Sequence, residues 1–264
     1  MKSPEALLIS KSAAGVAQVT MSRPAVFNAF DETMIAELDV AFDQLGNDAS
    51  VRLIVLAGAG KHFSAGADLR WMQRASSATA EWNLADAGCF AAMLERIQNC
   101  PKPTLARVQG AALGGGVGLI CACDIAIASA NASFAVSEAK FGILPAVIGP
   151  YLVNALGQRQ ARRLALTSTR IAAAEALAIG LVQQVVSVDA LDSVVAATVD
   201  ELLTGGPNAQ RAIKDFFAQL APAPINAELR ELSVQTISRV RASDEAREGF
   251  AAFLTKRPAN WILQ

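Results

Sequence analysis

Two glycine-containing segments and one glutamate have the residue types and the spacing for proton transfer next to a carbonyl group. The first segment, residues 110–118, carries five glycines in nine positions. Glycine weakens a helix or a strand by about 0.5–1 kcal/mol relative to alanine, so such a run indicates that the backbone approaches a ligand or another element closely. A helix that begins inside the run would direct free N–H groups at a developing negative charge. We therefore expect an oxyanion hole here.

A second turn of this kind, Phe-Ser-Ala-Gly-Ala-Asp at 63–68, follows an unbroken apolar strand at 51–57. The glycine run likewise follows an expected strand at 104–108. Two turns placed in this way can each direct one backbone N–H at the same carbonyl oxygen. Such a pair stabilises an enolate by roughly 3–4 kcal/mol for each donor.

Glu138 is the candidate for the base that such chemistry needs. It follows an expected apolar strand at 133–136 and precedes the apolar segment 141–145. A carboxylate in apolar surroundings has its pKa raised towards the working pH. The alternative is that Glu138 pairs with Lys140 or caps the next turn, and the residues by themselves leave both open.

Other reaction classes lack their residues. The single histidine, His62, has no nucleophile elbow to serve, although Ser64 is only two positions away, so a polar loop residue is the favoured interpretation. No cluster of His, Asp and Glu predicts a metal site. Gly58-Ala-Gly60 follows a strand, but Phe63 stands where a dinucleotide-binding fingerprint needs its third glycine.

Composition limits the protein class and its partners. The 264 residues are 53% hydrophobic and 18% charged, with a net charge of −1, which favours a compact protein with a partly covered surface. There is no basic excess for nucleic-acid binding and no segment that reads as a membrane span. The four cysteines follow no zinc spacing. The first residues lack the features of a leader peptide, so we expect a cytoplasmic protein.

The elements expected along the chain alternate before they become helical. The N-terminal hydrophobic patterns predict a hairpin at 6–11 and 16–22, a helix opened by Asp31, a strand at 51–57, a helix at 79–98, a strand at 104–108, a short buried helix at 117–123, and strands at 124–129 and 133–136. A repeated strand–strand–helix unit indicates stacked turns and not one doubly wound sheet. Helices are predicted at 190–203, 207–220, 225–240 and 244–254.

These motifs, taken in order, resemble the enoyl-CoA hydratase/isomerase (crotonase) family. They are Asn28-Ala-Phe30, Phe63-Ser-Ala-Gly-Ala-Asp68, Leu113-Gly-Gly-Gly-Val-Gly-Leu119 with Cys123-Asp124, and Glu138 with Gly142-Ile-Leu-Pro145. The resemblance implies an α/β fold, a superhelix of stacked ββα turns that spans residues 1–190 and holds an acyl-CoA site. Residues 191–264 would form a helical subdomain used to assemble a homotrimer or homohexamer. No cofactor is implied, because coenzyme A is part of the substrate.

The family's site residues fall on matching positions of this sequence. Glu138 would be the catalytic acid–base, and Ala67 and Gly115 would be the oxyanion donors. The coenzyme A would lie along Val26, Ala65, Asp68 and Leu69, with its phosphates near Lys256. For Lys256 and Arg257 a solvated charge near the C-terminus is an equal alternative.

Three further residues of these motifs receive structural interpretations. We expect Asp124 to be a buried carboxylate that nearby backbone satisfies. Cys121 and Cys123 are expected in the core of the short helix.

One departure from the family pattern concerns the mechanism. The two-carboxylate hydratases of the family carry a second glutamate where this chain has Gly118. A single carboxylate suits hydration or Δ3,Δ2-isomerisation, since both pass through the same enolate. Segments 137–151 and 157–163 resemble bacterial methylglutaconyl-CoA hydratases of leucine breakdown, which favours hydration of a branched 2-enoyl-CoA. The alternatives are an isomerase and an acyl-CoA-binding protein without activity.

Overall fold

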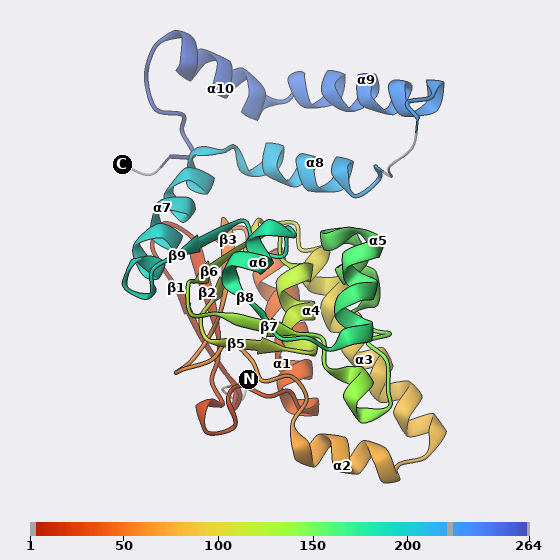
Figure 1. Cartoon of the computed structure of the whole chain (residues 1–264). Helices are drawn as coiled ribbons and strands as arrows, with labels where there is room; N and C mark the ends of the chain where they lie inside the picture. Colours follow the sequence, from red (N-terminus) through yellow and green to blue (C-terminus); the bar gives the residue numbers. More distant parts are fainter. Residues whose placement is uncertain (1–3, 221–223, 263–264) are drawn as a thin grey trace.

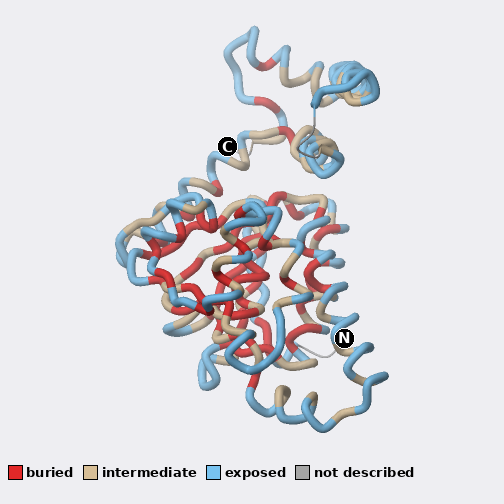
Figure 2. The backbone as a smooth tube through the Cα atoms, turned by 45° about the vertical axis from the view of Figure 1, so that its right-hand side comes forward, coloured by how far each residue is buried: buried red, intermediate tan, exposed pale blue. Residues whose placement is uncertain are grey.

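The fold is a spiral of strand–strand–helix turns with a layer of helices at its C-terminal end (Figure 1). A computed structural model of the chain describes residues 4–220 and 224–262. Figure 2 shows that the buried backbone concentrates in the spiral, whereas the C-terminal layer is mostly exposed or half-buried. The functional site therefore has to be sought where the turns of the spiral meet.

The larger sheet has six strands in the order β1-β2-β3-β4-β6-β9. Strands β1 (Leu7–Lys11) and β2 (Val16–Met21) form the predicted antiparallel hairpin. The others run parallel to β2: β3 (Leu53–Gly58), β4 (Thr104–Val108), β6 (Ile125–Ser129) and β9 (Gln184–Val186). All six residues of β3 are buried, as its continuous apolar sequence predicts for a parallel strand covered on both faces.

A second, smaller sheet follows the ends of these strands. It consists of β5 (Ala111–Leu113), β7 (Ser133–Ala135) and β8 (Ile171–Ala172), in that order. Isolated bridges extend it through the earlier turns, from Ala112 to Ser64 and from Ala67 to Phe30. Each turn of the chain thus adds one strand to the large sheet and one extended segment to the small one. This arrangement confirms the predicted stacked turns.

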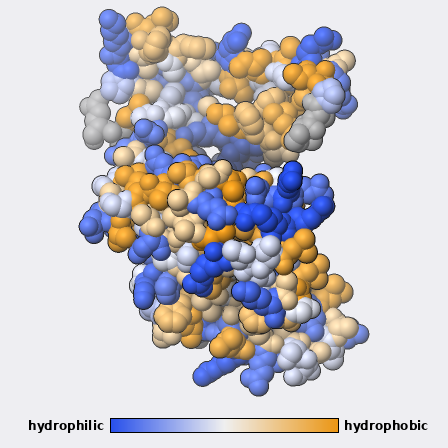
Figure 3. Space-filling view, in the orientation of Figure 1, coloured by the Kyte–Doolittle hydropathy of each residue, from blue (hydrophilic) through white to orange (hydrophobic). Residues whose placement is uncertain are grey.

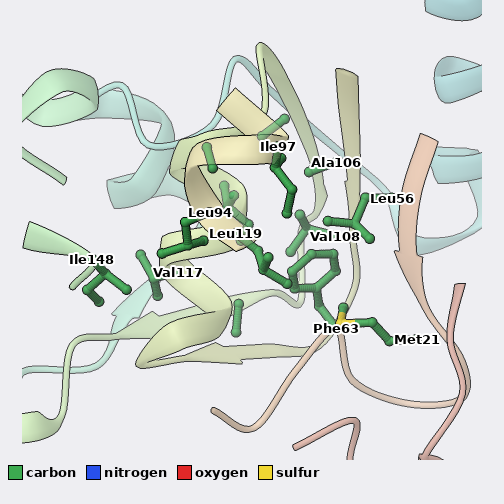
Figure 4. Packing of buried hydrophobic residues seen from close by; sticks show 14 of the residues in the cluster. Met21, Leu56, Phe63, Leu94, Ile97, Ala106, Val108, Val117, Leu119 and Ile148 are labelled. Carbon is green, nitrogen blue, oxygen red and sulfur yellow. The ribbon is translucent and has the colours of Figure 1, made fainter. Parts of the chain in front are cut away.

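Helices cover the two faces of the large sheet unequally. The main core lies on the face covered by α1 (Glu32–Asn47), α3 (Ala80–Gln98), α4 (Gly115–Ala122) and α5 (Gly149–Thr167). Figure 4 shows Phe63, Leu94 and Leu119 packed within it. The other face packs against α7 (Leu191–Thr204), which joins a second core with Leu53 and Leu105. Helix α7 therefore packs on the spiral itself.

The helices that stand apart from the spiral begin after α7. They are α8 (Pro207–Phe217), α9 (Ala227–Arg241) and α10 (Asp244–Leu254), which form the upper layer in Figure 1. Lys214 of α8 holds this layer to the spiral by donating hydrogen bonds to the Lys102 carbonyl and to Asp124 Oδ2. Arg52 donates to the carbonyls of Gly205 and Trp261 and adds a second connection.

Most predicted elements are confirmed within one or two residues, and several others were missed. The Asp31 side chain accepts the predicted capping bond at the start of α1, and the Thr79 side chain caps α3 in the same way. The helices α2 (Leu69–Ser77), α5 and α6 (Ala173–Ala178) and the strands β8 and β9 were not predicted. Helix α2 has nine residues, none of them buried, so it buries no side chain in the core. Strand β5, inside the glycine run, was expected to be part of a turn.

Candidate active site

An inner cavity and an outer groove meet where the small sheet crosses the starts of α2 and α4. The inner cavity, of about 460 Å³, is lined by Phe30 and by parts of four segments: 65–72, 87–90, 113–115 and 137–148. The outer groove, of about 730 Å³, is lined by residues between 23 and 31 and between 65 and 74. Ala65, Ala67 and Leu69 line both. A ligand with an apolar end and a polar end can therefore occupy the two together.

The Ala67 N–H faces the inner cavity because of the bridge to Phe30. Phe30 donates its N–H to the Gly66 carbonyl at 2.7 Å and accepts from the Asp68 N–H at 2.8 Å. A residue bridged in this way through both neighbours turns its own N–H to the opposite edge. Among the described residues, no acceptor takes the Ala67 N–H.

The Gly115 N–H is the second free donor at the cavity. Gly115 is the first residue of α4, so its N–H has no partner within the helix and lies at the positive end of the helix dipole. No described residue accepts it. Its loop is joined to the Ala67 loop by the hydrogen bond from Leu113 N–H to the Ser64 carbonyl. The two predicted oxyanion donors thus come from two hydrogen-bonded loops and line one cavity.

Close packing explains the glycines that precede each donor. Gly66 has a φ of +85° and Gly114 a φ of +50°, conformations that favour glycine. A β-carbon on Gly66 would lie 2.8 Å from the Leu113 carbonyl oxygen. On Gly115 it would lie 2.9 Å from carbon atoms of both Phe30 and Phe90. A side chain at Gly66 would push apart the loops that carry the donors, and one at Gly115 would displace Phe30 or Phe90.

A buried asparagine fixes the first of these loops. Asn28 is fully buried, and its side chain donates to the carbonyls of Ala59 and His62 and accepts from the Arg23 N–H. The Ser64 hydroxyl donates to the Asn28 carbonyl and accepts from the Gly66 N–H. The network explains why Asn28 and Ser64 occur in the motifs, since every polar atom that they bury has a partner.

Glu138 projects into the same cavity as the two donors. It opens a short 3-10 helix, Glu138–Phe141, after β7. Its Oε2 is buried without a hydrogen-bond partner among the described residues. Burial raises the pKa of Glu138, and the nearby amides of Glu138 and Ser137 offset that effect only in part. No ion pair joins it to Lys140 in the described part of the chain, so the carboxylate is available for proton transfer.

The side chain of Ile148 fills the space that a glutamate at position 118 would need. A β-carbon on Gly118 would overlap Ile148 Cγ2 and lie 3.0 Å from Ile148 Cβ. Leu94 Cδ1 closes the same space at 3.7 Å. Ile148 lines the inner cavity and is almost fully buried; Figure 4 shows it beside Val117 and Leu94. In the described lining of the cavity Glu138 is therefore the one ionisable side chain.

The predicted coenzyme A contacts divide into those at the groove and one far from it. Val26, Asp68 and Leu69 line the groove with Ala65. The Asp68 carboxylate is already engaged, because it caps α2 and pairs with Arg23 at 3.0 Å. Lys256 follows α10, at the opposite end of the molecule from α2 (Figure 1), and lines neither the groove nor the cavity.

Sequence patterns missed several residues that line the site. Arg70 lines the groove and has no acidic partner among the described residues, whereas Arg23 and Arg74 pair with carboxylates. Trp71 and Phe90 form an edge-to-face pair at the wall of the inner cavity. Arg70 and Trp71 lie on α2, which was not predicted, and Phe90 lies on α3. Only their positions beside the two loops show that they line the site.

Other singled-out residues have structural roles. His62 Nδ1 accepts the Ala111 N–H at 3.0 Å, which agrees with a polar loop residue. Burial raises the pKa of Cys121 to about 12, consistent with a residue packed against the core. Asp124 is not buried as expected: its residue is exposed, and Oδ2 accepts from the Thr104 N–H and hydroxyl and from Lys214. The expectation did not include the contact with Lys214 of α8, which lies 90 residues away in sequence.

The described residues contain no group of three or more His, Cys, Asp or Glu side chains arranged to hold a metal ion. None of the described helices has both the length and the apolar character needed to span a membrane.

Comparison with known proteins places this geometry in one family. A profile of the family described as enoyl-CoA hydratase/isomerase matches residues 11–264. The chain belongs to the enoyl-CoA hydratase/isomerase family. It is 33% identical to crotonyl-CoA hydratase of Syntrophomonas wolfei over 94% of both chains. It is 32% identical to short-chain-enoyl-CoA hydratase of Clostridium acetobutylicum over 92% of both.

Solved structures of the family share the architecture. The crystal structure of an enoyl-CoA hydratase from Shewanella pealeana superposes with a TM-score of 0.94 at 39% identity, covering 98% of this chain and 97% of the other. This similarity confirms the predicted crotonase fold with its C-terminal helices. The inner cavity therefore lies in an enoyl-CoA hydratase/isomerase scaffold.

Proposed function

We propose that the chain hydrates a 2-enoyl-CoA through an enolate, with Glu138 as its single acid–base. The observation that carries the proposal is the position of a buried, unpaired carboxylate in one cavity with the free N–H groups of Ala67 and Gly115. The hydratase names of its relatives point to the same reaction.

Glu138 would act first as a base and then as an acid. Its carboxylate takes a proton from water while the water oxygen bonds to C3 of the substrate. The electron pair of the double bond moves to the thioester oxygen, where Ala67 and Gly115 donate hydrogen bonds to the enolate. The protonated Glu138 then delivers its proton to C2. Loss of one such donor would cost about 3–4 kcal/mol of transition-state stabilisation.

The outer groove would hold the polar part of the coenzyme. Val26 and Leu69 expose apolar surface there, and Arg70 offers a guanidinium that no described carboxylate engages. Phosphates are recognised well by such a group. Lys256 would contribute only if a neighbouring chain brought it to this groove.

Isomerisation of a 3-enoyl-CoA is the second candidate, and the packing of Ile148 against Gly118 favours it. The apolar side chain stands where a second carboxylate would help to hold the attacking water. Isomerisation needs no water, since Glu138 can remove a proton from C2 and return it to C4. An acyl-CoA-binding protein without activity is the remaining alternative.

The most specific part of the proposal is the acyl group, which we propose to be branched and methylglutaconyl-like. Its support is the sequence resemblance of segments 137–151 and 157–163. A distal carboxylate would need a partner, and the described cavity lining offers the Ser137 hydroxyl and backbone amides but no lysine or arginine. Methylglutaconyl-CoA and 3-methylcrotonyl-CoA form a matched pair of substrates that differ by this carboxylate.

The absorbance of the conjugated enoyl thioester tests the reaction. Loss of the band from crotonyl-, 3-methylcrotonyl- or methylglutaconyl-CoA supports hydration, and detection of the 3-hydroxyacyl product by mass spectrometry confirms the added water. Appearance of the band from 3-hexenoyl-CoA, with none lost from the 2-enoyl compounds, replaces hydration by isomerisation. If the absorbance does not change with any substrate but acyl-CoA binds measurably, the chain is an acyl-CoA-binding protein without activity.

We also propose that α8–α10 mediate assembly into trimers or hexamers. Figure 3 shows apolar surface over this layer. Large apolar side chains exposed on it are Ile213, Phe217, Val234, Ile237, Phe250, Phe253 and Leu254. An exposed apolar surface of this kind is typical of an interface. Sedimentation equilibrium tests the proposal, and a monomer at micromolar concentration would contradict it.

A further inference from the structure

The contact between Gly118 and Ile148 joins two segments that are 30 residues apart in sequence. Gly118 lies in α4, one turn beyond Gly114, which adjoins Glu138. Ile148 immediately precedes α5 and lines the inner cavity. Because a β-carbon at 118 would overlap the Ile148 side chain, each residue restricts what the other can be.

We propose that Gly118 and Ile148 form a matched pair that determines which acyl groups the inner cavity accepts. Ile148 fills the space that any side chain at 118 would need, and it presents an apolar wall to the acyl chain. Its near-complete burial, with Leu94 against the same space, leaves little room for it to move aside. The inference rests on the proposed acyl-CoA site and goes beyond it by assigning its specificity.

Two consequences follow from this role, and the first of them separates it from plain core packing. Shortening Ile148 enlarges the cavity at this wall, so kcat/KM for a branched acyl-CoA should rise relative to kcat/KM for a linear one. A side chain added at 118 overlaps Ile148 Cγ2 first and Cβ second, so the loss of activity that it causes should depend on the size of residue 148. Val147 provides the matched control. It lines the same cavity, but the three atoms nearest to a β-carbon at 118 belong to Ile148 and Leu94 and not to Val147.

The test is a double-mutant cycle on the pair. Gly118→Ala should lower kcat/KM at least tenfold. Ile148→Ala in the same chain removes the Cγ2 overlap but keeps Cβ at 3.0 Å, so it should restore part of that loss, whereas Val147→Ala should restore none. Ile148→Ala alone should raise the ratio of kcat/KM for 3-methylcrotonyl-CoA over crotonyl-CoA by about tenfold, the usual effect of a few methyl groups in an apolar pocket. Full activity of Gly118→Ala, or equal rescue by Val147→Ala, would overturn the proposal.

Binding of unreactive acyl-CoA distinguishes this proposal from the proposed reaction. The ratio of the dissociation constants of butyryl-CoA and isovaleryl-CoA, measured by calorimetry, reports the fit of the cavity without turnover. If the unmodified chain turns over no enoyl-CoA but Ile148→Ala shifts this ratio towards isovaleryl-CoA, the reaction is wrong and the specificity assignment stands. If turnover occurs and neither ratio moves, the specificity assignment is wrong. The Ile148→Ala measurements suffice should Gly118→Ala fail to fold.

Discussion

Gly114 and Glu138 approach each other so closely that a methyl group would not fit comfortably between them. A β-carbon on Gly114 would lie 3.1 Å from Glu138 Oε1. Gly114 also donates its N–H to the Ala135 carbonyl at 2.8 Å, which joins the glycine turn to the strand that leads to Glu138. The base and the oxyanion donor at Gly115 are therefore positioned by one contact between two loops.

Replacing Gly114 by alanine should displace Glu138 and strain the turn, because φ is +50° at this position. We expect kcat to fall by about 10²-fold, in the range reported when acid–base geometry is lost. KM for the acyl-CoA should change little, since the groove is not touched. Steady-state kinetics measure both values. An equal loss in kcat and gain in KM would show that the turn supports binding as well.

Replacing Glu138 by glutamine should abolish turnover, with a loss of roughly 10²–10⁴-fold, the range of general acid–base catalysis. The amide has nearly the same shape, so the dissociation constant of a saturated acyl-CoA should stay within a few-fold. Glu95, whose side chain lies outside the inner cavity, is the matched control for loss of a carboxylate. Full activity of Glu138→Gln would refute the site assignment.

The raised pKa of Glu138 predicts how activity depends on pH. The base must be ionised in the free enzyme, so kcat/KM should fall as the pH drops through the raised pKa of Glu138. This fall should occur at a pH above ~4.3, the ordinary pKa of glutamate. A pH–rate profile measures the acidic limb. A limb at or below the ordinary value would contradict the buried carboxylate.

The same raised pKa predicts a dependence of stability on pH. Between the ordinary pKa of an unfolded glutamate and the raised folded value, the folded chain binds more protons than the unfolded chain, so this group destabilises the fold as the pH rises through that window. Glu138→Gln removes the effect. The stability of Glu138→Gln relative to the unmodified chain should therefore grow with pH across the window and then stay constant. Urea unfolding at several pH values measures the difference.

Replacing Arg70 by alanine should raise KM for acyl-CoA about fivefold to tenfold at low salt, because the guanidinium is free to contact phosphate. The effect should shrink at high ionic strength. With a pantetheine thioester, which lacks the nucleotide phosphates, the substitution should have no effect. Arg159, which does not line the groove or the inner cavity, is the control. An equal rise in KM for acyl-CoA and for the pantetheine thioester would show that Arg70 does not contact the phosphates.

The stacked turns followed from local patterns, because each strand, cap and glycine turn depends on neighbouring residues. The apolar run of β3, the Asp31 cap and the glycines before each donor all have local causes. Helix α2 was not predicted in this way. It is short, and none of its residues is buried in the core. Arg70 and Trp71 lie on it, and they became candidates only when its position was known.

The sequence by itself determined the glycine turns, the identity of Glu138 as the candidate base and the absence of a second glutamate at Gly118. Only the tertiary structure decided that Glu138 Oε2 has no partner, that Ile148 fills the space beside Gly118, and that Lys256 lies far from the groove. The physical reason is that a residue's conformation is set by its neighbours in the chain. Its partners, its pKa and the space around it are set by side chains that only folding brings into contact.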